Sequence, residues 1–195
     1  MNIAYLGWGS LIWDKRNLPI NGEWMRGGPV LPIEFSRVSK DERLTLVIDD
    51  VSGVPIETFY AICSEENLID AIEKLRVREG GTKKAYIGHV NISNGSDSLT
   101  DYPNQLPVHK SVADWGISHG FDAVIWTALP SNFYDSTNLP FSTDNALIYL
   151  QKLADGPLDL AIEYILKTRT EVQTPFRKKF DATWRGKINS RKREE

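Results

Sequence analysis

Glu79 is the residue whose predicted surroundings best suit acid–base chemistry. Residues 65–79 are expected to form a helix, and its apolar face carries Leu68, Ile72 and Leu75. Glu79 continues this face one turn later and, at about 100° per residue, points within roughly 20° of Leu68. Burial and the negative end of the helix macrodipole would both raise the pKa of Glu79. Because a carboxyl group of raised pKa exchanges protons near neutral pH, the pattern predicts a general acid and base.

The same stretch permits simpler interpretations. The helix could fray at its end, with Glu79 turned to solvent or paired with Arg76 or Arg78. Tyr86, seven residues after Glu79, begins the next predicted strand, and its hydroxyl could reach the same pocket. The alternative for Tyr86 is a core or cross-strand aromatic, which is the more common position of a strand tyrosine.

A glycine-containing turn follows the first predicted strand, Ile3 to Leu6. Its residues are Gly7, Trp8, Gly9, Ser10 and Leu11. Glycines allow a tight turn in which backbone N–H groups approach a ligand closely, and successive N–H groups can bind a carboxylate. Ser10 adds a hydroxyl group. The pattern therefore indicates a ligand-binding turn, and its alternative is a plain strand end with Trp8 in the core.

The remaining sequence predicts the elements that position these residues. Further strands are expected at residues 32–38, 44–48, 58–62, 85–92 and 121–129, and helices at residues 142–153, from Pro157 onward and around 176–184. Residues 15–32 and 93–120 are rich in turn residues and are expected to be loops, the second with one short helix. Ser64 and Ser142 are predicted N-caps. This order of elements predicts an α+β domain over residues 1–170.

The composition excludes several classes of protein and site. One cysteine among 195 residues excludes an intrachain disulfide and a cysteine-based zinc site, and three scattered histidines show no metal-ligand spacing, so no metal is expected. The net charge of −3 argues against a generally basic nucleic-acid-binding protein. Apolar runs are far shorter than a membrane span, and the N-terminal sequence lacks the layout of a signal peptide. We expect a cytoplasmic protein without nucleic-acid or membrane partners.

The C-terminal segment, residues 171–195, is expected to be a basic helical extension. Residues 176–195 carry eight Lys or Arg and three acidic residues, so the rest of the chain has a net charge of −8. Phe176, Phe180 and Trp184 lie on one face of the expected helix. That amphipathic pattern leaves open an interaction with a protein, a nucleic acid or an anionic membrane. Its alternative is that the aromatic side chains pack on the domain and the basic residues are solvated.

The turn, the helix-end acid and the spaced tyrosine together resemble the γ-glutamylcyclotransferase-like superfamily, which includes the ChaC-type enzymes that cleave glutathione. The strand that opens this family's domain ends in Tyr-Gly-Ser-Leu or Tyr-Gly-Ser-Asn, and the matching residues here are Trp8, Gly9, Ser10 and Leu11. Its catalytic Glu ends the central helix, and the matching residues are Glu79, Gly80 and Tyr86. The order of elements agrees over about residues 1–165. Trp8 stands where the family has Tyr.

The resemblance implies a small mixed β-barrel with a central helix and C-terminal flanking helices. It implies that Glu79 is the catalytic acid and base, and that Gly7, Trp8, Gly9, Ser10, Leu11 and Tyr86 bind the substrate. The substrate would be a γ-glutamyl amine, amino acid or peptide whose α-amine attacks its own γ-carbonyl. The products would be 5-oxoproline and the leaving amine, formed by a transferase or lyase of glutathione metabolism without a cofactor. Because an indole only donates hydrogen bonds, Trp8 keeps open a non-catalytic binding module on the same fold.

Overall fold

The computed structural model describes residues 1–98 and 106–191, including all their side chains except those of residues 106 and 185–191. The chain divides into two compact units. Unit 1 comprises Met1–Leu31 and Glu57–Pro130, and unit 2 comprises Pro32–Ile56 and Ser131–Glu195. Residues 171–191, the described part of the expected C-terminal extension, therefore fall within unit 2. The combination of sheets and helices confirms the predicted α+β class.

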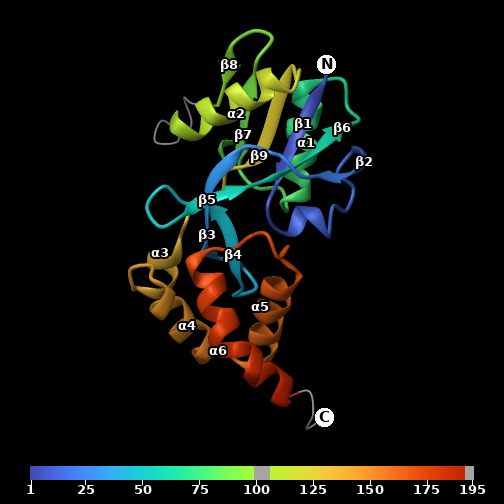
Figure 1. The fold of residues 1–195 in the computed structure, drawn as a ribbon. Coiled ribbons are helices and arrows are strands. Elements are labelled where there is room, and N and C mark those ends of the chain that lie inside the picture. The colour runs from blue at the N-terminus through green and yellow to red at the C-terminus, as the bar shows by residue number, and fades with distance from the viewer. Residues whose placement is uncertain (99–105, 192–195) are drawn as a thin grey trace. The chain divides into compact units, whose positions relative to one another are not determined.

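Unit 1 is built on a six-stranded mixed sheet in the order β2-β6-β1-β9-β7-β8. Its strands are β1 (Ile3–Gly7), β2 (Ile20–Met25), β6 (Phe59–Cys63), β7 (Ile87–Asn91), β8 (Ser96–Asp97) and β9 (Ala123–Thr127) (Figure 1). β1 is antiparallel to β6 and parallel to β9. Among the described residues the sheet is open, because β2 and β8 are its edges and do not pair with each other. The described strands of unit 1 therefore do not form a closed barrel, and of the predicted small mixed β-barrel fold only the coarser α+β class is observed.

Two α-helices in the described part of unit 1 cover opposite faces of the sheet. Helix α1 (Leu68–Arg78) contributes Ala71 and Leu75 to a core that also contains Ala123 and Ile125 of β9. The alternate residues of β9 face helix α2 (Leu106–Ser118), because His109 contacts Trp126 edge-to-face with ring centroids 5.0 Å apart. This alternation is the ordinary period of a strand, and it assigns odd-numbered residues of β9 to the α1 face.

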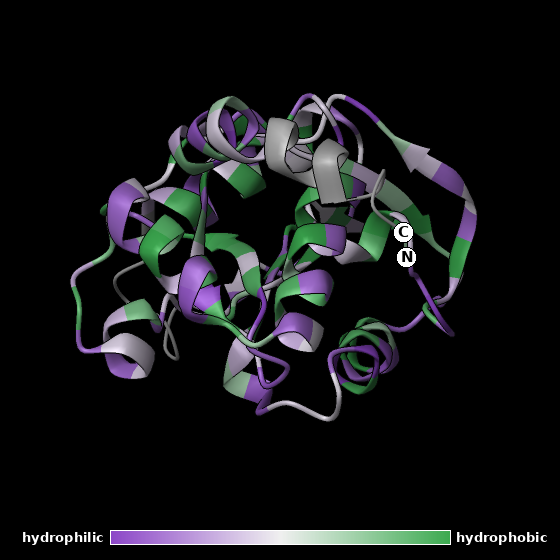
Figure 2. Ribbon diagram, turned by 90° about the horizontal axis from the view of Figure 1, so that it is seen from below, coloured by the Kyte–Doolittle hydropathy of each residue, from purple (hydrophilic) through white to green (hydrophobic). Residues whose placement is uncertain are grey.

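In its described residues, unit 2 has a three-stranded sheet, four helices and a core of its own. The strands, in the order β4-β3-β5, are β3 (Val30–Val38), β4 (Leu44–Ile48) and β5 (Val54–Glu57). The helices are α3 (Phe133–Thr137), α4 (Thr143–Lys152), α5 (Asp155–Lys167) and α6 (Pro175–Arg191). Apolar and polar residues alternate along the helical ribbons, as expected for helices with one buried face (Figure 2). The hydroxyl of Ser142 accepts a hydrogen bond of 3.1 Å from Asn145 N, which confirms the predicted cap of α4.

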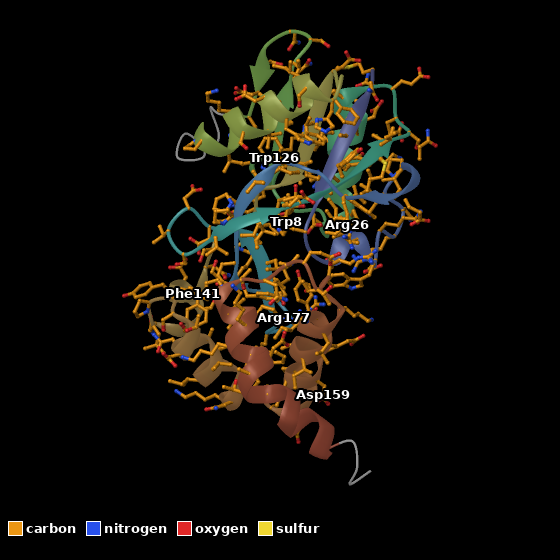
Figure 3. All side chains as sticks on the ribbon, viewed as in Figure 1. Trp8, Arg26, Trp126, Phe141, Asp159 and Arg177 are labelled. Atoms are coloured by element: carbon orange, nitrogen blue, oxygen red, sulfur yellow. The ribbon has the colours of Figure 1, made fainter. Side chains whose placement is uncertain are left out.

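Helix α6 packs its aromatic face inside unit 2. Phe176, Phe180 and Trp184 are all buried, and successive rings lie 6.1 and 5.9 Å apart. Arg177, labelled in Figure 3, is buried as well and donates a hydrogen bond to Ile165 O. The aromatic residues are therefore core residues, which removes the apolar half of the predicted interaction helix. Among the described residues, no helix combines the length and the apolar character needed to span a bilayer.

Several expected element boundaries are wrong. The predicted loop 15–32 contains strand β2, and the predicted loop 93–120 contains β8 and the 13-residue helix α2. Residues 99–105 of that loop lie outside the described residues. Asn67, not Ser64, caps α1, because Asn67 Oδ1 accepts a hydrogen bond of 2.8 Å from Ile69 N. Both residue types are good caps, so the sequence does not distinguish between these two sites.

Candidate active site

The sequence-predicted residues of unit 1 lie near the end of its sheet where strands β1 and β9 finish. The parallel strands β1 and β9 both end there, at Gly7 and Thr127. Ile87, the first residue of β7, pairs with Thr127, and Ala128 N donates a hydrogen bond of 2.8 Å to Tyr86 O. The turn after β1 and the main chain of Tyr86 therefore lie at the same end of the sheet. The carboxyl ends of parallel strands are a common place for ligand sites.

Glu79 lies at the C-terminus of α1, near the same end of the sheet. It is the first residue after the helix, with φ −80° and ψ 23°, and its side chain is 15 % exposed. Gly80 and Gly81 follow with φ of +76° and +71°, a conformation that glycine adopts without strain. The side chain of Glu79 is therefore largely but not fully buried, and it also pairs with Arg78, which the sequence offered as an alternative to burial. The alternative of a solvent-exposed, frayed end is not observed.

Arg78 connects Glu79 to the turn after β1. Its Nη1 donates a hydrogen bond of 3.1 Å to Glu79 Oε1, and its Nη2 donates one of 3.3 Å to Ser10 Oγ. Its Nε and Nη2 also donate to the main-chain oxygen of Asp14. The guanidinium is buried, with a side-chain exposure of 6 %. Ser10 and Glu79, 69 positions apart in the sequence, are thus bound to the same side chain.

Opposing influences act on the carboxyl group of Glu79. Burial raises its pKa above the ordinary value for glutamate, and the charges of Arg78 and Arg16 lower it. The Thr127 hydroxyl, buried and without a well-formed hydrogen bond to any described residue, lies near enough to lower it further. The rise from burial prevails. The raised pKa makes the Glu79 carboxylate a stronger base than an ordinary glutamate.

The five residues of the turn have different environments. A Cβ at Gly7 would lie 2.7 Å from Trp24 Cζ3, so the close approach of this ring requires glycine. Trp8, labelled in Figure 3, is only 5 % exposed, and Leu11 packs in the core beneath α1. Gly9 precedes a short 3-10 helix, Ser10–Ile12, and Asp14 N closes the turn with a hydrogen bond of 2.8 Å to Ser10 O. Ser10 is the residue of the turn that contacts Arg78.

Two residues that lower the pKa of Glu79 were not predicted from the sequence. Arg16 has a φ of +50°, donates hydrogen bonds to Asp14 Oδ2 (3.2 Å) and Arg78 O (3.4 Å), and keeps 58 % of its side chain exposed. Thr127 is the other. Its odd position in β9 assigns it to the α1 face, a signal that becomes usable only once the pairing of β9 with β1 is known.

A surface groove of about 420 Å³ lies at the other ends of α1 and β7. It is lined by Met1, Glu66, Asn67, Leu68, Ile69, Ile72, His89, Asn91, Asn94 and Ser96. None of the predicted site residues is among them. Within the described parts of the chain, no group of three or more His, Cys, Asp or Glu side chains is arranged to hold a metal ion.

Comparison with known proteins adds no relative to this description. No protein-family model, no curated protein and no solved structure matches the chain.

Proposed function

We propose that the chain is a γ-glutamylcyclotransferase-like enzyme, acting as a transferase or lyase, that releases 5-oxoproline from a γ-glutamyl amine, amino acid or peptide. The observation that carries this proposal is the largely buried carboxyl group of Glu79, which is joined through Arg78 to Ser10 of the turn after β1. The reaction needs one group that moves protons beside one segment that holds the substrate. The cytoplasmic location and the γ-glutamyl substrate stay predictions.

The proposed reaction is an intramolecular aminolysis. The α-ammonium group of the substrate loses a proton to Glu79, and the free amine attacks the γ-carbonyl carbon. The new C–N bond closes a five-membered ring, and the bond to the leaving nitrogen breaks as protonated Glu79 returns the proton to it. The ionised Glu79 then takes the second proton from the ring nitrogen and passes it to the released amine, which departs as an ammonium ion. The atoms balance without a water, metal or cofactor. A base whose pKa is raised by burial can perform these transfers.

The turn after β1 would hold the reacting ends of the substrate together. Restricting a flexible γ-glutamyl chain to its attack geometry is worth a large factor in rate, because the entropy of ring closure is then lost on binding. Hydrogen-bond donors near the γ-carbonyl would stabilise the oxyanion that develops in the transition state. In this proposal Gly7 at the end of β1, Gly9 and Ser10 supply the backbone and hydroxyl contacts, Trp8 and Leu11 shape the turn from the core side, and Tyr86 contacts the substrate.

The test is an assay for released 5-oxoproline with a panel of γ-glutamyl amines, γ-glutamyl amino acids and glutathione. We expect wild-type turnover of at least one panel member and a decrease of about 100-fold or more in Glu79→Gln, which preserves shape but cannot accept the proton. Glu73→Gln is the matched control, because Glu73 lies on the same helix and pairs at the surface with Arg76. It should keep wild-type activity.

Two results would contradict the proposal. Full activity of Glu79→Gln would remove Glu79 from the chemistry. Absence of turnover of every panel member by the wild-type protein would overturn the proposed enzymatic activity. Binding of the same compounds, measured by calorimetry, would then favour the non-catalytic binding module.

A further inference from the structure

Arg78 is a buried cation whose position is defined by several hydrogen bonds. A charged side chain with 6 % exposure loses most of its hydration, so it is stable only where hydrogen bonds and opposite charge replace that hydration. Arg78 has these partners on two sides. Its Nε and Nη2 donate to Asp14 O, and its Nη1 donates to Glu79 Oε1.

These contacts fix the turn after β1 against the end of α1. Asp14 and Ser10 belong to one closed turn, because Asp14 N bonds Ser10 O at 2.8 Å. Arg78 bonds both of them, the first through its main-chain oxygen and the second through its hydroxyl. The planar guanidinium has donors in several fixed directions, so it can hold the turn and Glu79 at the same time.

We propose that Arg78 is a positioning residue of the proposed reaction, which holds the carboxyl group of Glu79 in a fixed place relative to Ser10 of the substrate-binding turn. This inference rests on the proposed cyclotransferase function. Arg78 binds Glu79 at Oε1, so the inference assigns proton uptake from the substrate to Oε2. The substrate and the base then keep one relative geometry through ring closure and departure of the amine.

Arg78 also provides the nearest positive charge to Glu79. This charge lowers the pKa of a carboxyl group whose pKa burial raises. A variant without a cation at position 78 should therefore have a higher Glu79 pKa than wild type, and the acid limb of its pH–rate profile should move to higher pH. A purely structural residue would change the amount of folded protein without moving that limb.

The experiment compares kcat, KM and the pH dependence of kcat/KM in wild type, Arg78→Met, Arg78→Lys and Arg76→Met. Arg76 is the matched control, since it lies on the same helix but bonds Glu73 and Thr82 O rather than the turn. We expect Arg78→Met to lower kcat by roughly 10- to 100-fold with little change in KM and to move the acid limb upward. Arg76→Met should leave kcat and the limb unchanged.

Arg78→Lys keeps the inference testable if Arg78→Met does not fold. A lysine retains the buried charge but lacks the planar guanidinium. We therefore expect Arg78→Lys to have a reduced kcat while the acid limb of its pH–rate profile stays at the wild-type position. Wild-type kcat in both variants, or an unmoved limb in a folded Arg78→Met, would overturn the role of Arg78 and leave the proposed function standing. A wild-type protein without activity would overturn the proposed function first, before any variant is compared.

Discussion

Arg78 and Glu79 are consecutive in the chain, yet Arg78 Nη1 donates a hydrogen bond of 3.1 Å to Glu79 Oε1. Neighbours within a helix point about 100° apart and do not face each other. The contact forms because the helix ends at Arg78 and Glu79 adopts a ψ of 23°, outside the helical range. Gly80 and Gly81 then turn the chain with positive φ. The termination of α1 is therefore what brings the acid and its cation together.

Replacing Gly80 by alanine should weaken the site without a steric clash. A Cβ at Gly80 would meet no atom within 4 Å, so the only cost is the positive φ of +76°. For an L-residue this costs about 1 kcal/mol. We expect Gly80→Ala to lower the free energy of unfolding by about that amount in urea titrations. We also expect a lower kcat in the 5-oxoproline assay, because relief of the strain moves Glu79 away from Arg78.

Gly95→Ala is the control for Gly80→Ala. Gly95 has a φ of +71° and equally open space around a Cβ, but it lies between β7 and β8. The Gly95→Ala variant should lose a similar free energy of unfolding and keep the wild-type kcat. An equal effect of both substitutions on kcat would mean that backbone strain at Gly80 has no specific connection to the site.

Arg16 should influence the pH dependence of activity through its charge. Its charge lowers the pKa of Glu79, and its side chain is more than half exposed. The Arg16→Gln variant should therefore have a higher Glu79 pKa, so that the rise of kcat/KM with increasing pH begins at a higher pH than in wild type. Lys15→Gln, one residue earlier, is the charge-matched control and should leave the profile in place. An unmoved profile in Arg16→Gln would show that this charge is screened from Glu79.

The features predicted from the sequence are those that depend on local periodicity. The spacing of Leu68, Ile72 and Leu75 predicts the apolar face of α1, and the same spacing predicts that Glu79 is buried. Strand β2 is missed because Asn21-Gly22 resembles a turn. In the structure the pairing of β2 with β6 shifts register between Asn21 and Met25, so this dipeptide marks an irregularity inside a strand.

The features missed from the sequence depend on contacts between distant segments. Closure of a barrel requires pairing of the two edge strands, and no pattern within β2 or β8 determines whether they meet. Thr127 joins Glu79 only because β9 lies parallel to β1 and beneath α1. The pairing of Arg78 with the adjacent Glu79 can be expected from the sequence. Its hydrogen bonds to Ser10 and Asp14 cannot, because they join segments that are distant in the chain.

Glu79 should make the stability of the protein depend on pH in a defined direction. Its pKa is raised in the folded state, so the unfolded chain ionises first as pH rises past about 4.3. Stability is then lost progressively until the pH exceeds the folded pKa. Gln cannot ionise, so the melting temperature of Glu79→Gln relative to wild type should increase through this window and then stay constant. A difference that is independent of pH would contradict the raised pKa.

Glu73→Gln should show the opposite dependence. Arg76 lowers the pKa of Glu73, so the ionised form contributes stability above the pKa of the unfolded chain. As pH rises through that range, the melting temperature of Glu73→Gln should fall relative to that of wild type. Because Glu73 is on the surface, this effect should be small and should diminish in high salt.

Glu34 should be important for the stability of unit 2 through the start of α6. It is fully buried, its Oε1 accepts a hydrogen bond of 2.7 Å from Phe35 N, and its Oε2 accepts one of 3.3 Å from Phe176 N in the first turn of α6. Burial raises its pKa, while these two N–H groups and the Thr174 hydroxyl favour its charge. Removal of the carboxylate leaves both N–H groups buried without an acceptor and opens a cavity. We expect Glu34→Ala to cost about 2–4 kcal/mol in urea titrations.

Two comparisons separate the hydrogen bonds of Glu34 from its volume and charge. Glu34→Gln keeps the volume and one carbonyl acceptor, so its free energy of unfolding should lie between those of Glu34→Ala and wild type. It should not reach the wild-type value, because the amide group donates a hydrogen bond where the carboxylate accepted one. Glu163→Ala removes an exposed carboxylate that pairs with Lys167 on α5, and it should change stability by no more than about 0.5 kcal/mol. Equal losses in Glu34→Ala and Glu163→Ala would mean that Glu34 does not hold the start of α6. The destabilised variants should lose the near-ultraviolet circular dichroism of Phe176, Phe180 and Trp184 before that of unit 1, because those rings pack in the core that α6 completes.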